Sequence, residues 1–214
     1  MKFIKSALAA ASLVAVMAPA TAAIVVLDFE GIGNAVAVGN FYNGGAGTNY
    51  GVQFSPATLA LVDSDAGGTG NFANEPSPST IMFFLDANNA TLNVAAGFDT
   101  GFSFFYSSST VATVNVYAGQ NKPGALLGSL NLAAQGFDNC VGDPTGAFCN
   151  WTAVGVAFAG IAKSIDFGGT ANFTGFDNIT FGTNVPVVPE PSTYALMALG
   201  LAGVGLISRR RKSA

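Results

Sequence analysis

Histidine is absent from this 214-residue chain. Its absence excludes Ser-His-Asp triads, histidine-based metal centres and an imidazole base for a catalytic cysteine. Phosphate-binding and dinucleotide-binding glycine motifs are missing as well. A carboxylate pair of the kind that glycosidases use remains, but nothing in the spacing of the candidates Asp86, Asp99 and Asp138 singles out two of them. We therefore expect no enzyme and assign no catalytic residue.

Basic residues are nearly as scarce. Six of the eight lysines and arginines lie in the first five or last six residues, so residues 24–184 keep only Lys122 and Lys163 against eleven acids, a formal charge of −9. Two lysines cannot form a basic patch, which excludes nucleic acid as a partner. The excess of carboxylates instead offers ligands to divalent cations.

Cysteine occurs only twice, as Cys140 and Cys149, on either side of the turn-rich segment VGDPTGAF. A zinc site would need further cysteine or histidine ligands, and a catalytic cysteine would need a base. In an exported chain the pair predicts a disulfide, which would contribute on the order of 2–3 kcal/mol for so short a loop.

Long apolar runs occur only at the two ends. Residues 1–23 have the order of a secretory signal peptide: Lys2 and Lys5, then an apolar stretch over residues 7–17, then Ala20 and Ala22 as the small residues of a cleavage site. An uncleaved anchor is disfavoured because the apolar stretch is short and meets Pro19. The segment predicts export.

Residues 185–214 combine a linker with three features in a fixed order. A turn made of Pro189, Glu190 and Pro191 is followed by an apolar run over residues 193–207 and a basic tail over 208–214 that contains Arg209, Arg210 and Arg211. The run is shorter than the ~20 residues of a relaxed membrane span, but the cations after it match a cytoplasmic border. We predict a transmembrane helix rather than a buried core helix.

The stretch VPEPSTYALMALGLAGVGLISRRRK resembles the PEP-CTERM sorting signal. The resemblance implies a Gram-negative bacterium whose exosortase, a membrane cysteine transpeptidase, recognises residues 189–191 and removes the tail. It implies transient anchoring in the inner membrane, followed by release to the cell surface or extracellular matrix. Proteins of this kind are often associated with exopolysaccharide or biofilm matrix.

Residues 24–184 read as one all-β domain, because short Val-, Ile-, Phe- and Thr-rich runs alternate with Gly, Asn, Asp and Pro clusters. We predict an antiparallel β-sandwich with jelly-roll topology. The expected strands are Ile24–Phe29, Gly51–Ser55, Thr58–Val62, Ile81–Leu85, Ala90–Val94, Thr100–Tyr106, Thr110–Ala118, Leu126–Leu132, Trp151–Phe158, Ala162–Phe167 and Gly175–Phe181.

Acidic residues recur in the first and last expected strands. Terminal strands of a jelly roll can lie side by side, which would bring Asp28 and Glu30 near Asp177. The arrangement resembles the structural calcium site of carbohydrate-binding β-sandwich modules, and that resemblance implies calcium as a structural cofactor. The alternative is that Asp28 and Glu30 lie on the solvent side of an alternating strand and that Asp177 and Asn178 form a turn or bulge. Asp63–Gly68 is a weaker cation candidate, because its EF-hand-like pattern stops after the sixth position.

Two function classes remain open. The body either binds polysaccharide or acts as a structural or adhesive matrix protein without a small ligand; a glycoside hydrolase is less favoured. An exposed Tyr or Trp beside acids or amides would favour binding. The candidates are the aromatics with a polar group: Tyr42, Tyr50, Tyr106, Tyr117 and Trp151. Available edge strands without such a groove would favour the structural role.

Overall fold

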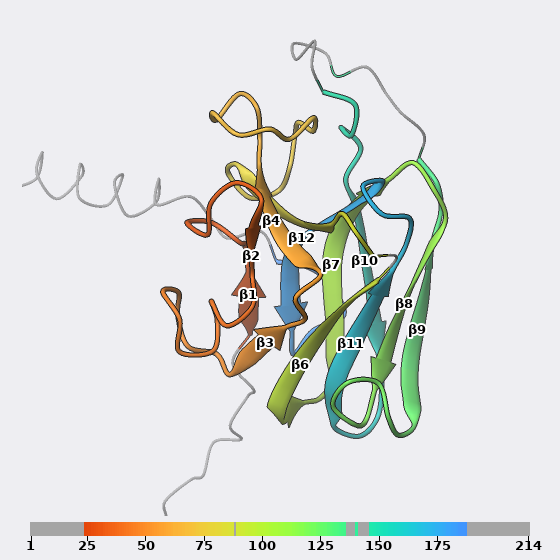
Figure 1. Ribbon diagram of the computed structural model, residues 1–214. Helices are drawn as coiled ribbons and strands as arrows, with labels where there is room; N and C mark the ends of the chain where they lie inside the picture. The colour runs from red at the N-terminus through yellow and green to blue at the C-terminus, as the bar shows by residue number, and fades with distance from the viewer. Residues whose placement is uncertain (1–23, 88, 136–139, 141–145, 188–214) are drawn as a thin grey trace, which may run out of the picture.

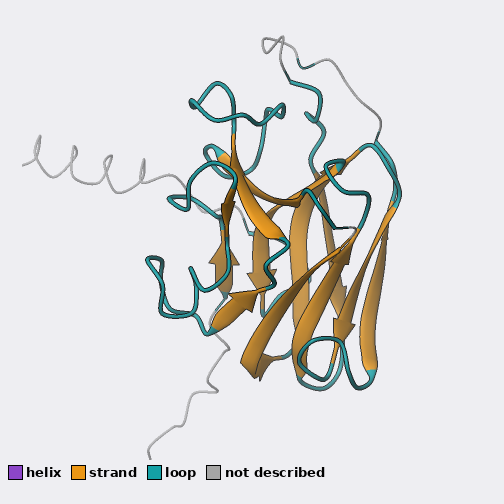
Figure 2. Ribbon diagram, viewed as in Figure 1, coloured by secondary structure: helices purple, strands orange, loops and turns teal. Residues whose placement is uncertain are grey.

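A computed structural model describes residues 24–187 except 88, 136–139 and 141–145. The predicted signal peptide, the sorting motif and the predicted transmembrane helix lie outside the described residues. The described part is built from strands and loops without any helix (Figure 2). Accordingly, it contains no helix of the length and apolarity that a membrane span requires.

Twelve strands form the domain, and all paired strands run antiparallel. Each of the eleven expected strands has a counterpart; only the two-residue β2 was not predicted. In chain order the strands are β1 Val25–Leu27, β2 Val36–Ala37, β3 Val52–Phe54, β4 Thr58–Val62, β5 Thr80–Phe84, β6 Asn89–Phe98, β7 Gly101–Ser108, β8 Ala112–Tyr117, β9 Leu126–Leu132, β10 Thr152–Ala157, β11 Ala162–Gly168 and β12 Thr174–Phe181.

The strands are arranged in two sheets (Figure 1). Sheet A has the order β10-β7-β12-β5-β4-β2, with β1 also paired to β12, and sheet B has the order β3-β6-β11-β8-β9. Eight of these strands, β5 to β12, contribute four to each sheet. Their order is β5-β12-β7-β10 in sheet A and β6-β11-β8-β9 in sheet B. This is the strand order of a jelly roll, so the predicted sandwich and its topology are confirmed.

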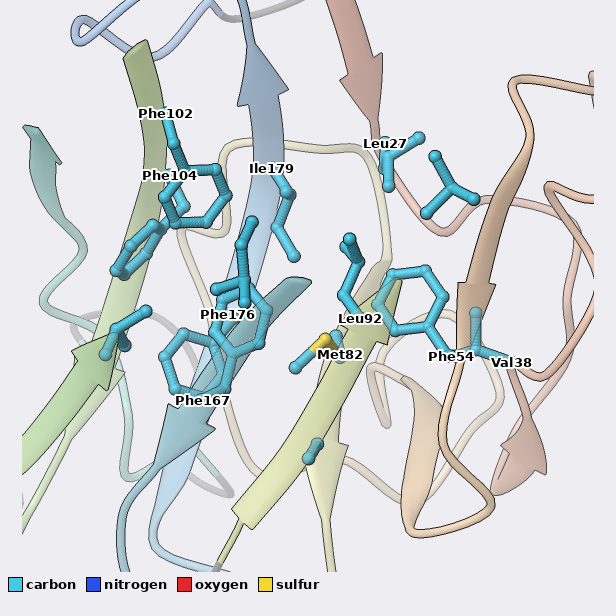
Figure 3. Packing of buried hydrophobic residues seen from close by; sticks show 14 of the residues in the cluster. Leu27, Val38, Phe54, Met82, Leu92, Phe102, Phe104, Phe167, Phe176 and Ile179 are labelled. Carbon is cyan, nitrogen blue, oxygen red and sulfur yellow. The ribbon is translucent and has the colours of Figure 1, made fainter. Parts of the chain in front are cut away.

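Aromatic rings from both sheets fill the core. Phe102 and Phe104 of β7 point inward with Phe176 of β12, and they meet Phe167 of β11 from the opposite sheet (Figure 3). The rings of Phe167 and Phe176 pack edge to face with their centroids 4.9 Å apart, and those of Phe104 and Phe167 with their centroids 5.8 Å apart. Such edge-to-face contacts add to the stabilisation from burial itself. The cluster is what holds the two sheets face to face.

The two cysteines are joined, with Cα atoms 5.6 Å apart. The predicted disulfide Cys140–Cys149 is therefore present in the structure. Two residues further on, Trp151 packs edge to face against Phe72, and its indole N–H donates to the Ala73 carbonyl at 3.1 Å. The cysteine loop thus leads directly into a ring that is fixed in position at the start of β10.

Candidate functional site

The first and last strands lie side by side, as expected from the sequence. Val26 pairs with Thr180 and Leu27 with Ile179; β1 ends at this pair, so Asp28 follows it directly on one chain and Asn178 precedes it on the other. Asp28, Glu30 and Asp177 therefore gather where β1 ends against the middle of β12. They share one junction, which we call the β1–β12 junction and define by Asp28, Glu30, Tyr42, Asp177 and Asn178.

Both strands depart from regular geometry at this junction. The register between β12 and β7 shifts between Asp177 and Thr180, which marks a bulge. Within it Asn178 has a positive φ of 47°, and two residues after the end of β1 Phe29 has a φ of 61°. A left-handed conformation is strained for a bulky aromatic residue. Bulges of this kind re-aim side chains, here those of Asp177 and Asn178.

Asp177 is fully buried. Its Oδ2 accepts the Ser77 N–H at 2.7 Å and its Oδ1 accepts the Asn178 N–H at 2.6 Å. The pKa of Asp177 is raised to about 7, mainly by burial and in smaller part by the nearby charge of Glu30, against the lowering effect of hydrogen bonds from Ser77 and Asn178. The junction thus holds a carboxylate whose charge is costly to keep there.

Glu30 braces the junction from the other side. Its Oε1 accepts the N–H groups of Ser79 and Thr80, both at 2.8 Å, and its Oε2 accepts the hydroxyls of the same two residues, both at 3.1 Å. Each oxygen therefore accepts two hydrogen bonds. Glu30 ties the chain after β1 to the start of β5 and leaves few lone pairs for any other ligand.

Tyr42 closes the junction against the core. Its hydroxyl accepts the Phe29 N–H at 2.7 Å and lies 3.4 Å from Asp28 Oδ1. Burial raises the pKa of Tyr42, and the negative charge of Asp28 raises it further. The expectation that Tyr42 and Tyr106 line a binding face is wrong, because each side chain is only 3% exposed and belongs to the core cluster.

Asn178 supplies the junction's unpaired groups. Its side-chain oxygen and nitrogen are both buried without a hydrogen-bond partner in the structure. A buried polar group left unsatisfied costs about 1–3 kcal/mol and calls for an ion, a water or a functional role. Within the described ranges, no three acidic, histidine or cysteine side chains are placed to hold a metal. A cation here would need the amide oxygen and backbone carbonyls as well as carboxylates.

A second candidate site surrounds Trp151. An open groove beside the ring is lined by Asn74, Gln135, Asn150 and Thr152. Gln135 is held in place, because its Oε1 accepts the Ser108 N–H at 3.1 Å and its Nε2 donates to the Thr152 hydroxyl. The sequence drew attention to Trp151 but not to these amides, which come from separate loops and from the start of β10. We call this set of five residues the Trp151 groove.

The acids considered for glycosidase chemistry do not form a pair. Asp86 and Asp99 flank the two ends of the ten-residue strand β6, which places them about 30 Å apart along it. A glycosidase needs its two carboxylates roughly 5–10 Å apart. Asp138 lies outside the described residues.

The weaker cation candidate, Asp63–Gly68, is a closed turn. The Asp63 carbonyl accepts the N–H groups of Ala66 at 3.1 Å and Gly68 at 2.8 Å, and its carboxylate lies 3.4 Å from the Asp65 N–H. These contacts explain the spacing of its acids and glycines as turn chemistry.

Comparison with known proteins gives one match by sequence and several by structure. The profile of the PEP-CTERM protein-sorting motif matches residues 187–212. No curated protein matches the chain. Similar solved structures include the carbohydrate-binding module CsCBM6-3 from Clostridium stercorarium in complex with cellobiose, at 16% identity and TM-score 0.36 over 59% of this chain and 82% of that one.

Two further structures show similar values. The carbohydrate-binding module of Cellvibrio mixtus lichenase 5A, in complex with cellotriose, has 15% identity and TM-score 0.36 over 62% of this chain and 90% of its own. The K3 cleaved adhesin domain of Lys-gingipain from Porphyromonas gingivalis has 14% identity and TM-score 0.36 over 60% and 93%. The chain carries a PEP-CTERM protein-sorting motif at residues 187–212, which implies export and exosortase-dependent sorting to the cell surface.

Proposed function

We propose that the sorted protein binds exopolysaccharide at the cell surface or in the extracellular matrix through the Trp151 groove. In this proposal, the apolar run over residues 193–207 anchors the precursor in the inner membrane of a Gram-negative cell until exosortase removes the tail. The observation that carries the binding role is an aromatic ring held beside three side-chain amides.

The groove has the chemistry that a sugar ring needs. An indole offers an apolar surface for the C–H face of a sugar, and amides offer both donors and acceptors to its hydroxyls. The ring of Trp151 is held by its N–H bond to Ala73 and its contact with Phe72, so little ordering entropy is lost on binding. The formal charge of −9 on residues 24–184 repels polyanions, which favours a neutral polysaccharide.

Replacement of Trp151 by Ala should weaken polysaccharide binding about tenfold or more, as loss of a central aromatic contact does elsewhere. The measurement is affinity electrophoresis of residues 24–187 in gels that contain neutral glucans, xylan or the producing cell's own exopolysaccharide. Asn150→Ala tests the groove without removing the ring, and Tyr117→Ala on sheet B is the aromatic control.

Equal retardation of the Trp151→Ala variant and the unaltered protein would rule out the groove as the binding site. If no polysaccharide retards the unaltered protein, the structural or adhesive role becomes the better account. That role has its own support in the edge strands β9 and β10, whose outer backbone groups are available for pairing between molecules.

We further propose that a divalent cation, calcium by its ligand chemistry, binds at the β1–β12 junction as a structural cofactor. Support comes from the buried Asp177 carboxylate, from Asp28 beside it and from the unpaired amide oxygen of Asn178. Glu30, expected from the sequence as a ligand, contributes charge but already accepts four hydrogen bonds. Calcium suits such a set because it accepts carboxylate, amide and carbonyl oxygens together.

Calcium should raise the melting temperature of residues 24–187 relative to the same protein in chelator. At a hundredfold excess over Kd the stabilisation is about 2.7 kcal/mol, which corresponds to roughly 5–10 °C for a domain of this size. Asp177→Asn should lose the shift, whereas Asp86→Asn on an exposed turn should keep it. Identical melts with calcium and with chelator would refute the cation site.

A further inference from the structure

The end of the sandwich where β6 and β12 finish is open and apolar. A cavity of about 280 Å³ lies there, lined largely by apolar side chains that include Val25, Phe98 and Phe181. Around it Ile24, Tyr50 and Ile161 are 55%, 41% and 57% exposed. We call this region, with Lys163 beside it, the exit end. Grouped apolar side chains at a surface commonly mark a contact with another partner.

The chain leaves the folded body beside this cavity. After β12 the Gly182 N–H donates to the Gly101 carbonyl at 3.1 Å, and the Thr183 carbonyl accepts the Ser103 hydroxyl at 3.0 Å. Asn184 then passes so close to Gly155 that a Cβ there would lie 2.0 Å from the Asn184 oxygen. This fixes the path of residues 182–187 over sheet A.

That path stays one residue away from the end of β12. The Val187 N–H donates to the Thr180 hydroxyl at 3.4 Å, and Thr180 lies in the same row of sheet A as Ser103 and Gly155, next to the last residue of β12, Phe181. Five residues, 188–192, then separate Val187 from the start of the apolar run. Even fully extended at ~3.3–3.6 Å per residue, they span no more than about 20 Å. An inserted tail would therefore hold this part of the body close to the bilayer surface.

The distribution of charge also favours a membrane contact at the exit end. Both lysines of the body lie near this end: the Lys122 N–H bonds to Ser164 at the start of β11, and the stem of Lys163 lies beside Gly97 of the cavity. Lys122 is paired with Asp166 at 2.9 Å. Among the residues that line the cavity, Asp99 is the only acid. In a body with a formal charge of −9, this end is the one suited to anionic headgroups.

We propose that the exit end rests on an anionic phospholipid bilayer while the sorting tail is still attached. Tyr50 and Ile161 enter the interfacial region, and Lys163 extends its ammonium group to the headgroups. The contact would orient the body so that residues 188–192 lie at the membrane surface, where a membrane enzyme acts. This inference rests on the proposed insertion of residues 193–207.

The test uses residues 24–214, the chain without the predicted signal peptide, in vesicles of phosphatidylethanolamine and phosphatidylglycerol. Flotation reports insertion of the tail. A tryptophan reporter is then introduced as Ile161→Trp in a Trp151→Phe background, and its fluorescence is compared between vesicles with and without brominated acyl chains. We expect about twofold quenching, since interfacial side chains lie within ~5–10 Å of the acyl boundary. The control is Val111→Trp. Val111 is 75% exposed and lies at the far end of the six-residue strand β8 from the exit end, so this reporter should show little quenching.

Lys163→Glu in the same background should reduce the quenching of the Ile161→Trp reporter while flotation persists. Equal quenching at positions 161 and 111, in chains that float, would overturn the proposal and leave tail insertion intact. Failure to float would refute insertion and this inference with it. A blue shift at position 161 that grows with protein concentration without vesicles would show self-association instead, and would also overturn it.

Discussion

Metal-free protein should lose stability as the pH rises from about 4 to about 7, because Asp177 binds its proton more tightly in the folded state. Burial lifts the pKa of Asp177 from 3.8 to about 7. Between these values the folded state holds a proton that the unfolded chain has lost, so the free energy of unfolding falls with pH. At about 1.4 kcal/mol per pH unit the fall is on the order of 4 kcal/mol. Below pH 4 this effect is absent, and above pH 7 it is complete.

Urea denaturation in chelator measures the free energy of unfolding at pH 5 and at pH 8. The difference between the two free energies is then compared with the same difference in the Asp177→Asn variant. At pH 5 that variant should be less stable than the unaltered protein, because an amide has one acceptor oxygen for the two N–H groups of Ser77 and Asn178. Its pH dependence should be much flatter. Asp86→Asn, on an exposed turn, should keep the full slope. An unaltered slope in Asp177→Asn would show that Asp177 is not the origin of the pH dependence.

Calcium and pH should be coupled at the same group. A bound cation favours the ionised carboxylate, so saturating calcium should remove most of the decline between pH 5 and pH 8. If calcium raises stability equally at both values, its site does not include Asp177. The experiment therefore separates a cation at the β1–β12 junction from one elsewhere on the acidic surface.

The strands were predictable because buried and exposed residues alternate along a strand of a β-sandwich, and this alternation is visible in the sequence. In β8, the inward residues Ala112, Val114 and Val116 alternate with polar or exposed ones, as expected for a strand with one face in the core. The two-residue β2 gave no signal because it is too short to show a period and both its residues are exposed. The sandwich with jelly-roll topology was predicted from many short strands separated by frequent turns, and the pairing of the last strand with the first was expected from that topology.

The junction was predictable only in part. Acids near the two chain ends are visible in the sequence, and strand pairing brings them together. Their partners are not visible, because Ser77, Ser79 and Thr80 lie about fifty residues from Glu30 and about a hundred from Asp177. Nor does the sequence reveal that a bulge turns Asn178 inward or that Tyr42 is enclosed, since both depend on packing between distant segments.

The Trp151 groove shows the same limit. A single tryptophan after a disulfide stands out in the sequence, but the amides beside it belong to three segments that meet only in the fold. The path of residues 182–187 is equally non-local: it depends on glycines at positions 101 and 155, whose role is clear only once Asn184 is seen to cross them. The sequence predicted that an exposed aromatic residue beside polar side chains could form a binding surface. It could not predict which residues lie together in the fold.

Substitutions in the sorting motif should block maturation completely, and in two distinguishable ways. The motif profile covers residues 187–212, including Glu190 and the three arginines. Glu190→Ala removes part of the Pro-Glu-Pro turn but keeps the apolar run and its basic tail. We expect this precursor to remain full length and in the membrane fraction of a host that contains exosortase. Immunoblotting and intact-mass measurement of fractionated cells provide the readout.

Replacing Arg209, Arg210 and Arg211 by Gln should give full-length precursor with a different distribution. The apolar run has about fifteen residues, short of the ~20 that hold a span firmly, and each arginine at the centre of a bilayer costs about 2.5–3.5 kcal/mol. In the proposed span, the three charges would keep the short run from passing through the bilayer, so without them part of the precursor should escape into the periplasm or medium. Ser213→Ala should mature normally. Normal maturation of the glutamine variant would show that the tail is retained by something other than its charge, and normal maturation of Glu190→Ala would refute recognition through the Pro-Glu-Pro turn.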